Sequence, residues 1–238
     1  FVIVRPDGEE RDITAQAAPI RNEAAEITGS IVVFQDITDR LHEQRQLAKI
    51  NRILYTIREI NFLITRGLEK ENLLRQVVDK LVASHNYRHA WIAIEEGDGT
   101  LSEFVHAPVD ESLARLADEV KSGKRPLCIE KAAESEDVVV MEEAAGCCGE
   151  PALHDSMGEC RALCMALRHR GRIHGYLSVA LTSERVEDPE ERRLLKDLGE
   201  DIGLALYGAE AEHQREAIMR ELREAKESAE NANKAKDD

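Results

Sequence analysis

The 238-residue sequence contains no apolar run that approaches the roughly 20 residues needed by a transmembrane helix. Its N-terminus also lacks the positively charged and then apolar layout of a signal peptide. We therefore expect a soluble, cytoplasmic chain with no membrane contact within these residues. A parent protein that is anchored in a membrane elsewhere is compatible with this expectation.

Positive charge is scarce in this chain. It carries 32 Lys and Arg residues against 47 Asp and Glu, which gives a net charge of −15 at pH 7. Nucleic acids and anionic membrane surfaces attract basic proteins, so this balance argues against either as the main partner. The acidic excess is more typical of a well-solvated surface.

The sequence also lacks the cysteine pattern of a disulfide framework. Its five cysteines are an odd number and are unevenly placed, in a chain long enough to build a core without covalent links. Reduced thiols of a cytosolic protein explain them better. Their placement is informative, because Cys147, Cys148, Cys160 and Cys164 fall within 18 residues.

The first 40 residues contain three predicted strands. Phe1–Val4 is apolar, Glu10–Ile20 alternates apolar with polar residues, and Gly29–Gln35 is a short apolar run. Asp7-Gly8 is a common tight-turn pair between the first two strands. Three hairpin-linked strands with no helix before them bury little surface, so they look like the end of a domain.

The third strand ends in a more specific sequence, Gln35-Asp36-Ile37-Thr38-Asp39-Arg40. Two strands joined by the Asp7-Gly8 turn and a strand that closes on this sequence resemble the C-terminal half of a PAS sensor domain. In that family the D-I-T triplet couples the last strand to an outgoing signalling helix. The resemblance assigns residues 1–38 to the last strands of a PAS domain, and it implies that any PAS ligand pocket is absent or incomplete here.

A helical pattern runs from Leu41 to about Gly67, with apolar residues on alternating steps of three and four. This seam predicts a coiled-coil signalling helix over residues 39–68 and a homodimer through parallel helices. Apolar residues beside the seam predict that the helix also packs against the following domain. The alternative is one amphipathic helix that covers a single core without a dimer. The seam consists of Leu47, Ile50, Leu54, Ile57, Asn61, Ile64 and Leu68, and the residues beside it are Ile53, Ile60, Phe62 and Leu63.

Helical and strand patterns alternate from Lys70 onward. They predict helices at Lys70–His85 and Leu113–Ser122, strands at Ala90–Ile94, Leu101–Ala107 and Pro126–Glu130, and an irregular or partly helical region from Lys131 to about Glu159. A hairpin of Cys164–Arg170 with Ile173–Leu181 follows, and a last helix starts at Asp188-Pro189, an N-cap and first-turn pair.

This order of elements resembles a GAF domain spanning residues 50–210. The sequence Arg172-Ile173-His174-Gly175-Tyr176-Leu177 is similar to the family's pattern of a large residue, a glycine and a hydrophobic strand. The resemblance implies an α+β fold, in which helices pack on an antiparallel sheet, flanked by long signalling helices and preceded by the PAS strands. It also implies that ligands bind between the sheet and the helices and loops across one face, with Lys131–Glu159 as the lid.

The C-terminal helix carries a third resemblance. Arg220–Lys236 is similar to the helix that enters the dimerisation and phosphoacceptor domain of hybrid sensor histidine kinases, so residues 211–238 are assigned to an outgoing helix. Leu222, Ala225, Ala229 and Ala232 form a narrow seam on it that suits close helix pairing. The chain has no glycine-rich nucleotide loop, and none of its eight histidines stands in a phosphoacceptor context. We expect no enzymatic activity of these residues, and a parent that transfers phosphate from ATP to histidine.

The cysteine cluster is the candidate site. The GAF resemblance puts Cys147 and Cys148 in the lid, Cys160 at its exit, Cys164 at the start of a strand and Cys128 on the preceding strand, all near one pocket. Thiolates are soft ligands, so the four clustered cysteines are candidate ligands of zinc or an iron–sulfur cluster. His154, or an adjacent-cysteine ligand with an open position, is the alternative that would complete such a site. The spacing C-C-x11-C-x3-C, however, lacks the paired C-x2-C of structural zinc sites.

Three other interpretations of the cluster stay open. In the first, a single cysteine or histidine serves as the axial ligand of a haem. In the second, two thiols that lie close together in a flexible lid form a reversible disulfide. Small, buried cysteines with no ligand role are the third interpretation.

Together these patterns predict the regulatory sensor region of a two-component histidine kinase. A metal, cluster, haem or redox signal would repack the lid and change the rotation or register of helices on the dimer axis. One alternative is a ligand-free structural relay and dimerisation module. A second, which rests on a likeness to free-standing GAF proteins, is a thiol reductase of free methionine sulfoxide.

Overall fold

The computed structural model describes residues 1–66, 69–85, 87–109, 111–142 and 160–237. Packing divides the chain into two units, Phe1–Leu54 and Tyr55–Asp238. Helix α1 (Thr38–Thr65) contributes to both units, because the division falls within it. In these ranges no helix is long and apolar enough to cross a membrane.

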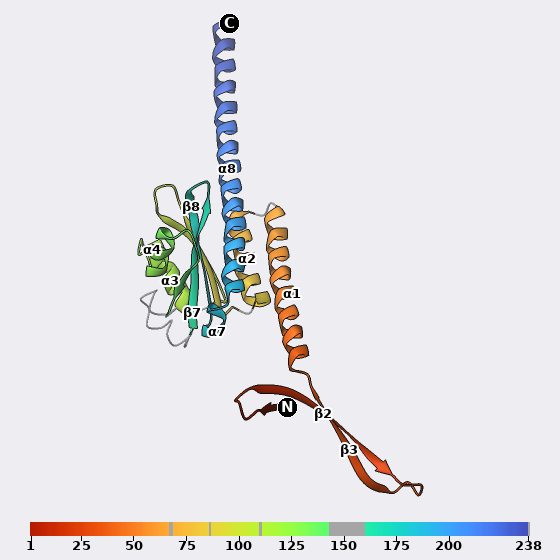
Figure 1. The fold of residues 1–238 in the computed structure, drawn as a ribbon. Coiled ribbons are helices and arrows are strands. Elements are labelled where there is room, and N and C mark those ends of the chain that lie inside the picture. The colour runs from red at the N-terminus through yellow and green to blue at the C-terminus, as the bar shows by residue number, and fades with distance from the viewer. Residues whose placement is uncertain (67–68, 86, 110, 143–159, 238) are drawn as a thin grey trace. The chain divides into compact units, whose positions relative to one another are not determined.

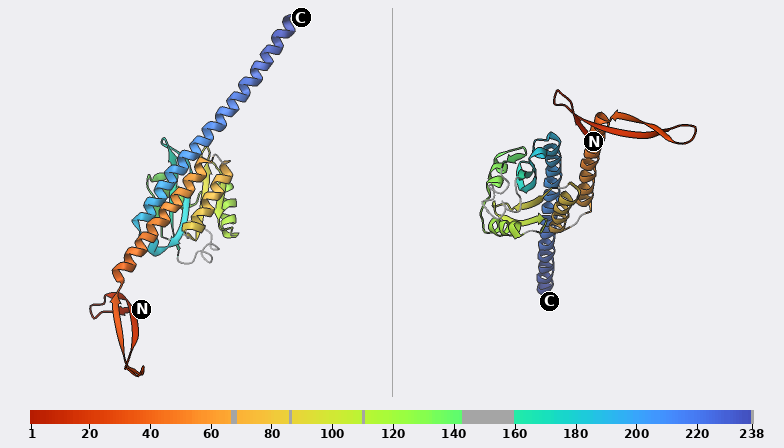
Figure 2. Two further views of the ribbon diagram at one scale, coloured as in Figure 1. Left: turned by 90° about the vertical axis from the view of Figure 1, so that its right-hand side faces the viewer. Right: turned by 90° about the horizontal axis from the view of Figure 1, so that it is seen from below.

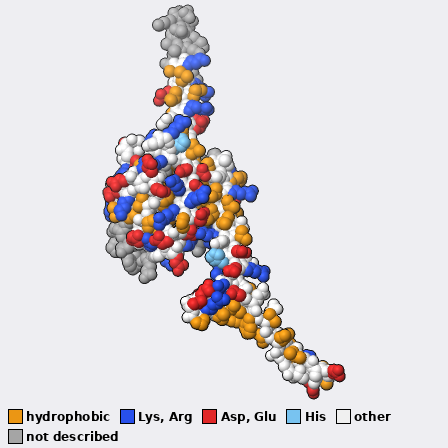
Figure 3. All heavy atoms as spheres, in the orientation of Figure 1, with side chains coloured by type: hydrophobic (Ala, Val, Ile, Leu, Met, Phe, Trp, Pro, Cys, Tyr) orange, Lys and Arg blue, Asp and Glu red, His pale blue; other side chains and the backbone are white. Residues whose placement is uncertain are grey.

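The first unit contains a three-stranded antiparallel sheet in the order β1-β2-β3. Its strands are β1 (Val2–Val4), β2 (Glu10–Arg21) and β3 (Ile27–Asp36), which confirms the three predicted strands. Val33 and Phe34 are neighbours on β3 and point to opposite faces, yet they are 59% and 65% exposed. Apolar side chains are therefore open on both faces of this sheet, and they gather along these strands in Figure 3.

The Asp36-Ile37-Thr38 sequence forms the junction between β3 and α1. The Asp36 carboxylate accepts hydrogen bonds from the Thr38 hydroxyl at 2.6 Å and from the Thr38 backbone N–H at 3.0 Å. These two bonds lower the pKa of the exposed Asp36 carboxyl. The Thr38 hydroxyl in turn accepts a bond from the backbone N–H of Asp12 at 2.8 Å, which ties the start of α1 to the central strand β2.

The second unit is built on a five-stranded antiparallel sheet in the order β5-β4-β8-β7-β6. Helices α3 (Glu111–Lys121) and α4 (Leu127–Glu134) cover one face, and α2 (Lys70–His85) and α8 (Pro189–Asp237) cover the other (Figures 1 and 2). A short helix, α7 (Ser183–Val186), joins β8 to α8. The strands are β4 (His89–Glu95), β5 (Leu101–Ala107), β6 (Val139–Met141), β7 (Cys160–His169) and β8 (Arg172–Thr182). This confirms the predicted α+β fold, in which helices pack on an antiparallel sheet.

Side-chain alternation along the strands divides the buried residues between two cores. The core under α3 and α4 includes Trp91, Leu113, Leu116, Ile129, Cys164 and Tyr176. The core under α2 and α8 is rich in leucine and includes Leu74, Leu81, Leu163, Leu167, Leu177 and Leu195, all fully buried. The thiols of Cys128, Cys160 and Cys164 lie in the first of these cores.

The C-terminal part of α1, from Tyr55 onward, belongs to the second unit and packs within it. Thr56, Ile60 and Leu63 are buried, and Glu59 forms an ion pair with Lys80 of α2 at 2.8 Å. This confirms that Ile60 and Leu63, which lie beside the predicted seam, contact the domain. The same prediction is wrong for Phe62, which is 58% exposed.

Two predicted strand positions are wrong. Residues 126–130 do not form a strand, because Pro126 takes the N-cap position with an extended backbone and α4 begins at Leu127. Cys128, Ile129 and Ala132 then fall on one buried helical face, a spacing that a five-residue apolar run cannot reveal. The strand predicted to begin at Cys164 begins at Cys160, so Cys160 is part of the sheet rather than the exit of a lid.

A buried carboxylate anchors the start of α8. Glu191 is 3% exposed and accepts hydrogen bonds from the Tyr87 hydroxyl at 3.0 Å and from Arg185 at 2.7 and 2.9 Å. Burial, and then the adjacent Glu191 charge, raises the pKa of Tyr87 well above its usual value. The phenol therefore stays protonated and remains a donor to Glu191.

Replacing Glu191 with alanine should lower the free energy of unfolding by about 3 kcal/mol, because Arg185 and the Tyr87 hydroxyl would lose their shared acceptor. Glu190→Ala is the matched control, since Glu190 is exposed in the same helical turn and its loss should cost less than about 1 kcal/mol. Urea unfolding at neutral pH, followed by circular dichroism, measures both. Equal losses in the two variants would contradict the anchoring role.

Candidate functional site

Three of the five cysteines lie on the sheet face that α3 and α4 cover. Cys128 is on α4, whereas Cys160 and Cys164 are on β7, and they are 1%, 6% and 0% exposed. All three are thiols rather than disulfides and belong to one apolar cluster. The fold thus brings these three predicted site residues to one face. The other three, Cys147, Cys148 and His154, lie outside the described residues.

Small side chains line the sheet beneath these thiols. Ala162 and Ala166 share the face with Cys160 and Cys164 on β7, and on β8 Ser178 pairs with Cys164. The β4–β5 half of the same face instead carries two large rings, Trp91 and Phe104, which stack with centroids 5.1 Å apart. Apart from the Tyr176 ring on β8, the β7–β8 half therefore has little side-chain volume of its own, and α4 packs against it.

Strand geometry limits how these thiols bind a metal. Cys160 and Cys164 are four residues apart on β7, which is about 13 Å at roughly 3.3 Å per residue. Zinc–sulfur bonds are about 2.3 Å long, so two thiolates on one ion have their sulfurs within about 5 Å of each other. One zinc ion therefore binds at most one of Cys160 and Cys164. In the part of the chain that the structure describes, no group of three or more His, Cys, Asp and Glu side chains is placed to hold a metal.

A polar network closes one end of this face. The Tyr176 hydroxyl and Arg125 both donate hydrogen bonds to the Glu95 carboxylate, each at 2.8 Å. Burial, and then the bond to Glu95, raises the pKa of Tyr176 to about 12, so its phenol stays protonated. Sequence patterns did not identify Glu95 or Arg125, because a contact across 30 residues leaves no local signal.

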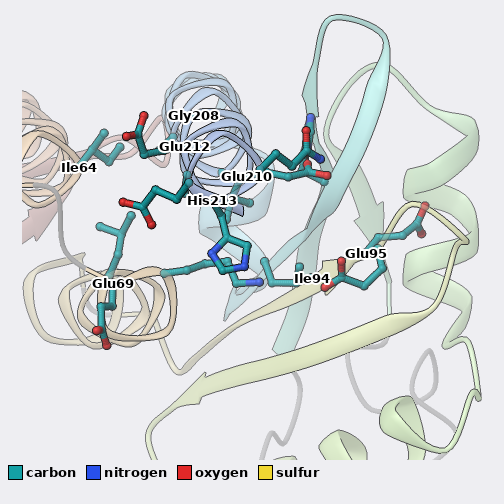
Figure 4. A pocket seen from close by; sticks show the side chains of 17 residues that line it. Ile64, Glu69, Ile94, Glu95, Gly208, Glu210, Glu212 and His213 are labelled. Atoms are coloured by element: carbon teal, nitrogen blue, oxygen red, sulfur yellow. Dashed lines mark ion pairs between the residues drawn. The ribbon is translucent and has the colours of Figure 1, made fainter. Parts of the chain in front are cut away.

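An acidic cleft of about 1030 Å³ lies between the start of α2, α8 and the ends of β4 and β8 (Figure 4). Figure 4 shows Glu69 across the cleft from His213 and Glu212 of α8. Glu210 is neutralised by Arg172 at 3.0 Å, as Glu95 is by Arg125. None of the cysteines in the described ranges lines this cleft, although Glu95 belongs both to its lining and to the polar network at the end of the thiol face. Six carboxylates line the cleft, those of Glu69, Glu95, Glu96, Glu210, Glu212 and Glu216.

His174 of β8 lies on the wall of the cleft and contacts two residues of α8. Its Nδ1 atom is 3.3 Å from the Glu210 carboxylate, and its ring meets the Tyr207 ring edge-on at 5.9 Å. Burial lowers the pKa of His174, although Glu210 opposes this shift. The imidazole is therefore neutral at pH 7, and its contact with α8 is one of packing and hydrogen bonding rather than of charge.

Comparison with known proteins agrees with the fold. A family model described as GAF domain matches residues 67–206, more than half of the chain. No curated protein sequence matches this chain.

Several solved structures share the fold at low sequence identity. The GAF domain of nlh2 from A. aeolicus, in an inactive state, has a TM-score of 0.52 and 12% identity over 66% of this chain and 96% of its own. The GAF domain of a phosphoenolpyruvate-protein phosphotransferase from Coxiella burnetii has a TM-score of 0.51 and 14% identity, over 68% of this chain and 97% of its own. The free methionine-R-sulfoxide reductase from Neisseria meningitidis, in complex with its substrate, has a TM-score of 0.50 and 12% identity, over 67% of this chain and 90% of its own. At these identities the likeness shows the fold alone.

Ellman's reagent should leave Cys128, Cys160 and Cys164 unreacted in the folded chain, because a buried thiol is out of reach of the reagent. The double variant Cys147→Ser/Cys148→Ser keeps only these three thiols. We expect it to release almost no thionitrobenzoate under native conditions and three equivalents in guanidinium. Fast native reaction of any thiol in this variant would contradict their burial.

Proposed function

Because the chain belongs to the GAF domain family, we propose that residues 50–210 form a regulatory sensor domain that receives a signal at its thiol face and passes it to α8. In this proposal the parent is a two-component sensor histidine kinase, and the residues present here have no enzymatic activity of their own. Membership of the family supports a regulatory role.

The position of β7 carries this proposal. Cys160 and Cys164 face the α4 side of the strand. Met165, on the opposite side, packs against Gly199 of α8. A chemical change at the thiols therefore occurs one strand thickness from the helix that leaves the domain.

The signal that we propose has either a redox or a metal form. In the redox form, two thiols give up two electrons and two protons to an oxidant and join as a disulfide, which would repack the lid that the resemblance implies. In the metal form, Cys147, Cys148 and His154 bind zinc, an iron–sulfur cluster or a haem together with a thiol of the sheet face. The geometry of β7 favours metal sites that use only one of Cys160 and Cys164.

We also propose that residues 1–38 are the last strands of a PAS domain and that α1 carries a signal from it. The apolar side chains open on both faces of the β1-β2-β3 sheet support this assignment, because such strands need further cover. The Asp36 and Thr38 hydrogen bonds support it as well, since they tie the start of α1 to the sheet.

A parallel homodimer through α1 and α8 is the proposed form of the molecule. On α1, Leu47, Ile50 and Leu54 of the predicted seam are 61%, 51% and 58% exposed. On α8, Leu204, Ala211, Ile218 and Leu222 recur at steps of seven, seven and four, and the three large residues among them are more than half exposed. Steps of three, four and seven keep residues on one stripe, as a coiled-coil seam requires. Pairing with a second copy would cover both stripes.

Anaerobic purification, followed by an absorption spectrum and metal analysis, tests the metal form. Diamide, a two-electron thiol oxidant, followed by peptide mass spectrometry tests the redox form. We expect a stoichiometric metal or chromophore, or else a disulfide within the cysteine cluster. The variant Cys147→Ser/Cys148→Ser/Cys160→Ser/Cys164→Ser should lose whichever is found.

A chain with no metal, no chromophore and no diamide-induced disulfide would contradict the thiol signal and favour the ligand-free relay. Turnover of free methionine sulfoxide by the same preparation would favour the reductase instead. Because the quadruple variant contains two buried substitutions, circular dichroism should first show that it is folded.

Ile218→Glu should weaken the dimer by at least about tenfold, because a charge would enter the seam of α8. Arg220→Glu is the matched control, since Arg220 is also exposed and lies two residues from both Ile218 and Leu222, on the other side of the helix. Sedimentation equilibrium of the 238-residue chain measures both. A wild-type chain that stays monomeric, or equal effects of the two substitutions, would contradict this seam.

A further inference from the structure

Arg168 lies at an irregularity in the pairing of β7 with β8. Leu167 pairs with Gly175, but Arg168 pairs with Ile173, so His174 is an extra residue on β8. A bulge of this kind bends a hairpin and redirects the side chains beside it. Here it lies where the hairpin meets α8, because His174 is beside Glu210 of that helix.

On one side of β7, the Arg168 guanidinium holds the C-terminal end of α4. Its Nη2 atom donates hydrogen bonds to the backbone carbonyls of Ala133 at 2.5 Å and Ser135 at 3.3 Å. The last carbonyls of a helix lack partners within the helix and carry partial negative charge, so a cation stabilises them. The helix held in this way is the one that carries Cys128.

On the other side of β7, the backbone of Arg168 touches α8. A Cβ atom at Gly203 would lie 2.8 Å from the Arg168 carbonyl oxygen, which is closer than real Cβ contacts come. Only glycine therefore lets α8 rest on the strand at this point. One turn earlier, a Cβ atom at Gly199 would lie 2.4 Å from the end of the Met165 side chain, so α8 lies close to β7 there as well.

We propose that Arg168 is a coupling residue that links the position of α4 to the position of α8. One residue joins the two helices across the sheet, with its side chain on the first and its backbone on the second. The inference rests on the proposed function for its purpose, since it supplies the route from the thiol face to the outgoing helix.

The environment of the guanidinium explains why α4 and β7 move together. The Nε atom of Arg168 is buried and has no hydrogen-bond partner within the described ranges. The cation therefore depends on the two α4 carbonyls, and a buried donor that loses its acceptor carries a large penalty. A shift of α4 thus displaces the strand rather than breaking these bonds. Because the strand and α8 meet at a backbone contact, α8 shifts with it.

Hydrogen exchange of the 238-residue chain, measured by mass spectrometry, tests this coupling with Arg168→Met. This substitution keeps an unbranched stem and the backbone carbonyl but removes the guanidinium group and its bonds to α4. Loss of charged hydrogen bonds should speed exchange about tenfold in the last turn of α4. We expect a similar increase in α8 around Gly203, which the removed atoms do not touch. Arg168→Lys, which keeps a cation and a donor, should restore part of the protection at both places.

Two controls separate coupling from general loss of stability. Amides of β4, such as that of Ile92 in the middle of the sheet, report global unfolding, so each change is read relative to them. Arg170→Met removes the bond from Arg170 to the Tyr207 hydroxyl, which is 3.0 Å long, at the tip of the same hairpin. It should speed exchange in α8 near Tyr207 and leave α4 unchanged.

The coupling is also tested in the reverse direction. Gly203→Ala should push α8 off β7 and speed exchange in the last turn of α4. Gly208→Ala is the matched control, because a Cβ atom there meets nothing within 4 Å in the described structure. It should leave α4 unchanged.

Changes confined to α4 in Arg168→Met, or to α8 in Gly203→Ala, would overturn the coupling role. Neither result depends on the thiol chemistry. A detected metal or disulfide together with uncoupled helices would therefore reject the route while the sensor proposal stands. Coupled helices in a chain with no thiol signal would reject the sensor proposal, while the coupling through Arg168 stands.

Discussion

The alternation of side chains along β7 is the constraint on which the second unit depends. Cys160, Ala162 and Cys164 face α4, whereas Leu163, Met165 and Leu167 face α8. A slip of one residue would exchange the two sets and put thiols against the glycines of α8. Ten paired residues with β8, on a central part of the sheet, hold the register against such a slip. The thiol face and the face against α8 are therefore separated by a backbone that cannot easily rearrange.

Contacts along α8 divide this helix into a held part and an exposed part. Glu191 is buried at its start, Gly199 and Gly203 lie against β7, and Glu210 meets the hairpin through Arg172. Past this point, among the residues whose burial is described, the large apolar residues Ile218, Met219 and Leu222 are exposed. Any motion of the sheet would therefore act on the held part, and in the proposed dimer the exposed part would pair with another helix.

The sequence predicted those features that rest on local periodicity, and it missed those that rest on contacts between distant residues. Long amphipathic patterns located α2 and α8, and strand alternation located the hairpin of β7 and β8. Around Cys128 a short apolar run fitted strand and helix equally well, and the structure shows a helix. Arg168 carried no signal, because its partners Ala133 and Ser135 lie more than 30 residues away. The gathering of Cys128, Cys160 and Cys164 was foreseen only through the family resemblance.

The size of the signal bears on why a dimer suits the proposed mechanism. Extra atoms forced into a packed core cost about 1–3 kcal/mol, which changes an equilibrium between two helix positions by roughly 5- to 150-fold. A switch from 1:99 to 99:1 needs about 5.5 kcal/mol, more than one such site supplies. In a parallel dimer both copies bias the same pair of outgoing helices, so their contributions add to about 2–6 kcal/mol. Two thiol faces acting on one helical seam therefore approach a complete switch, which one domain alone does not.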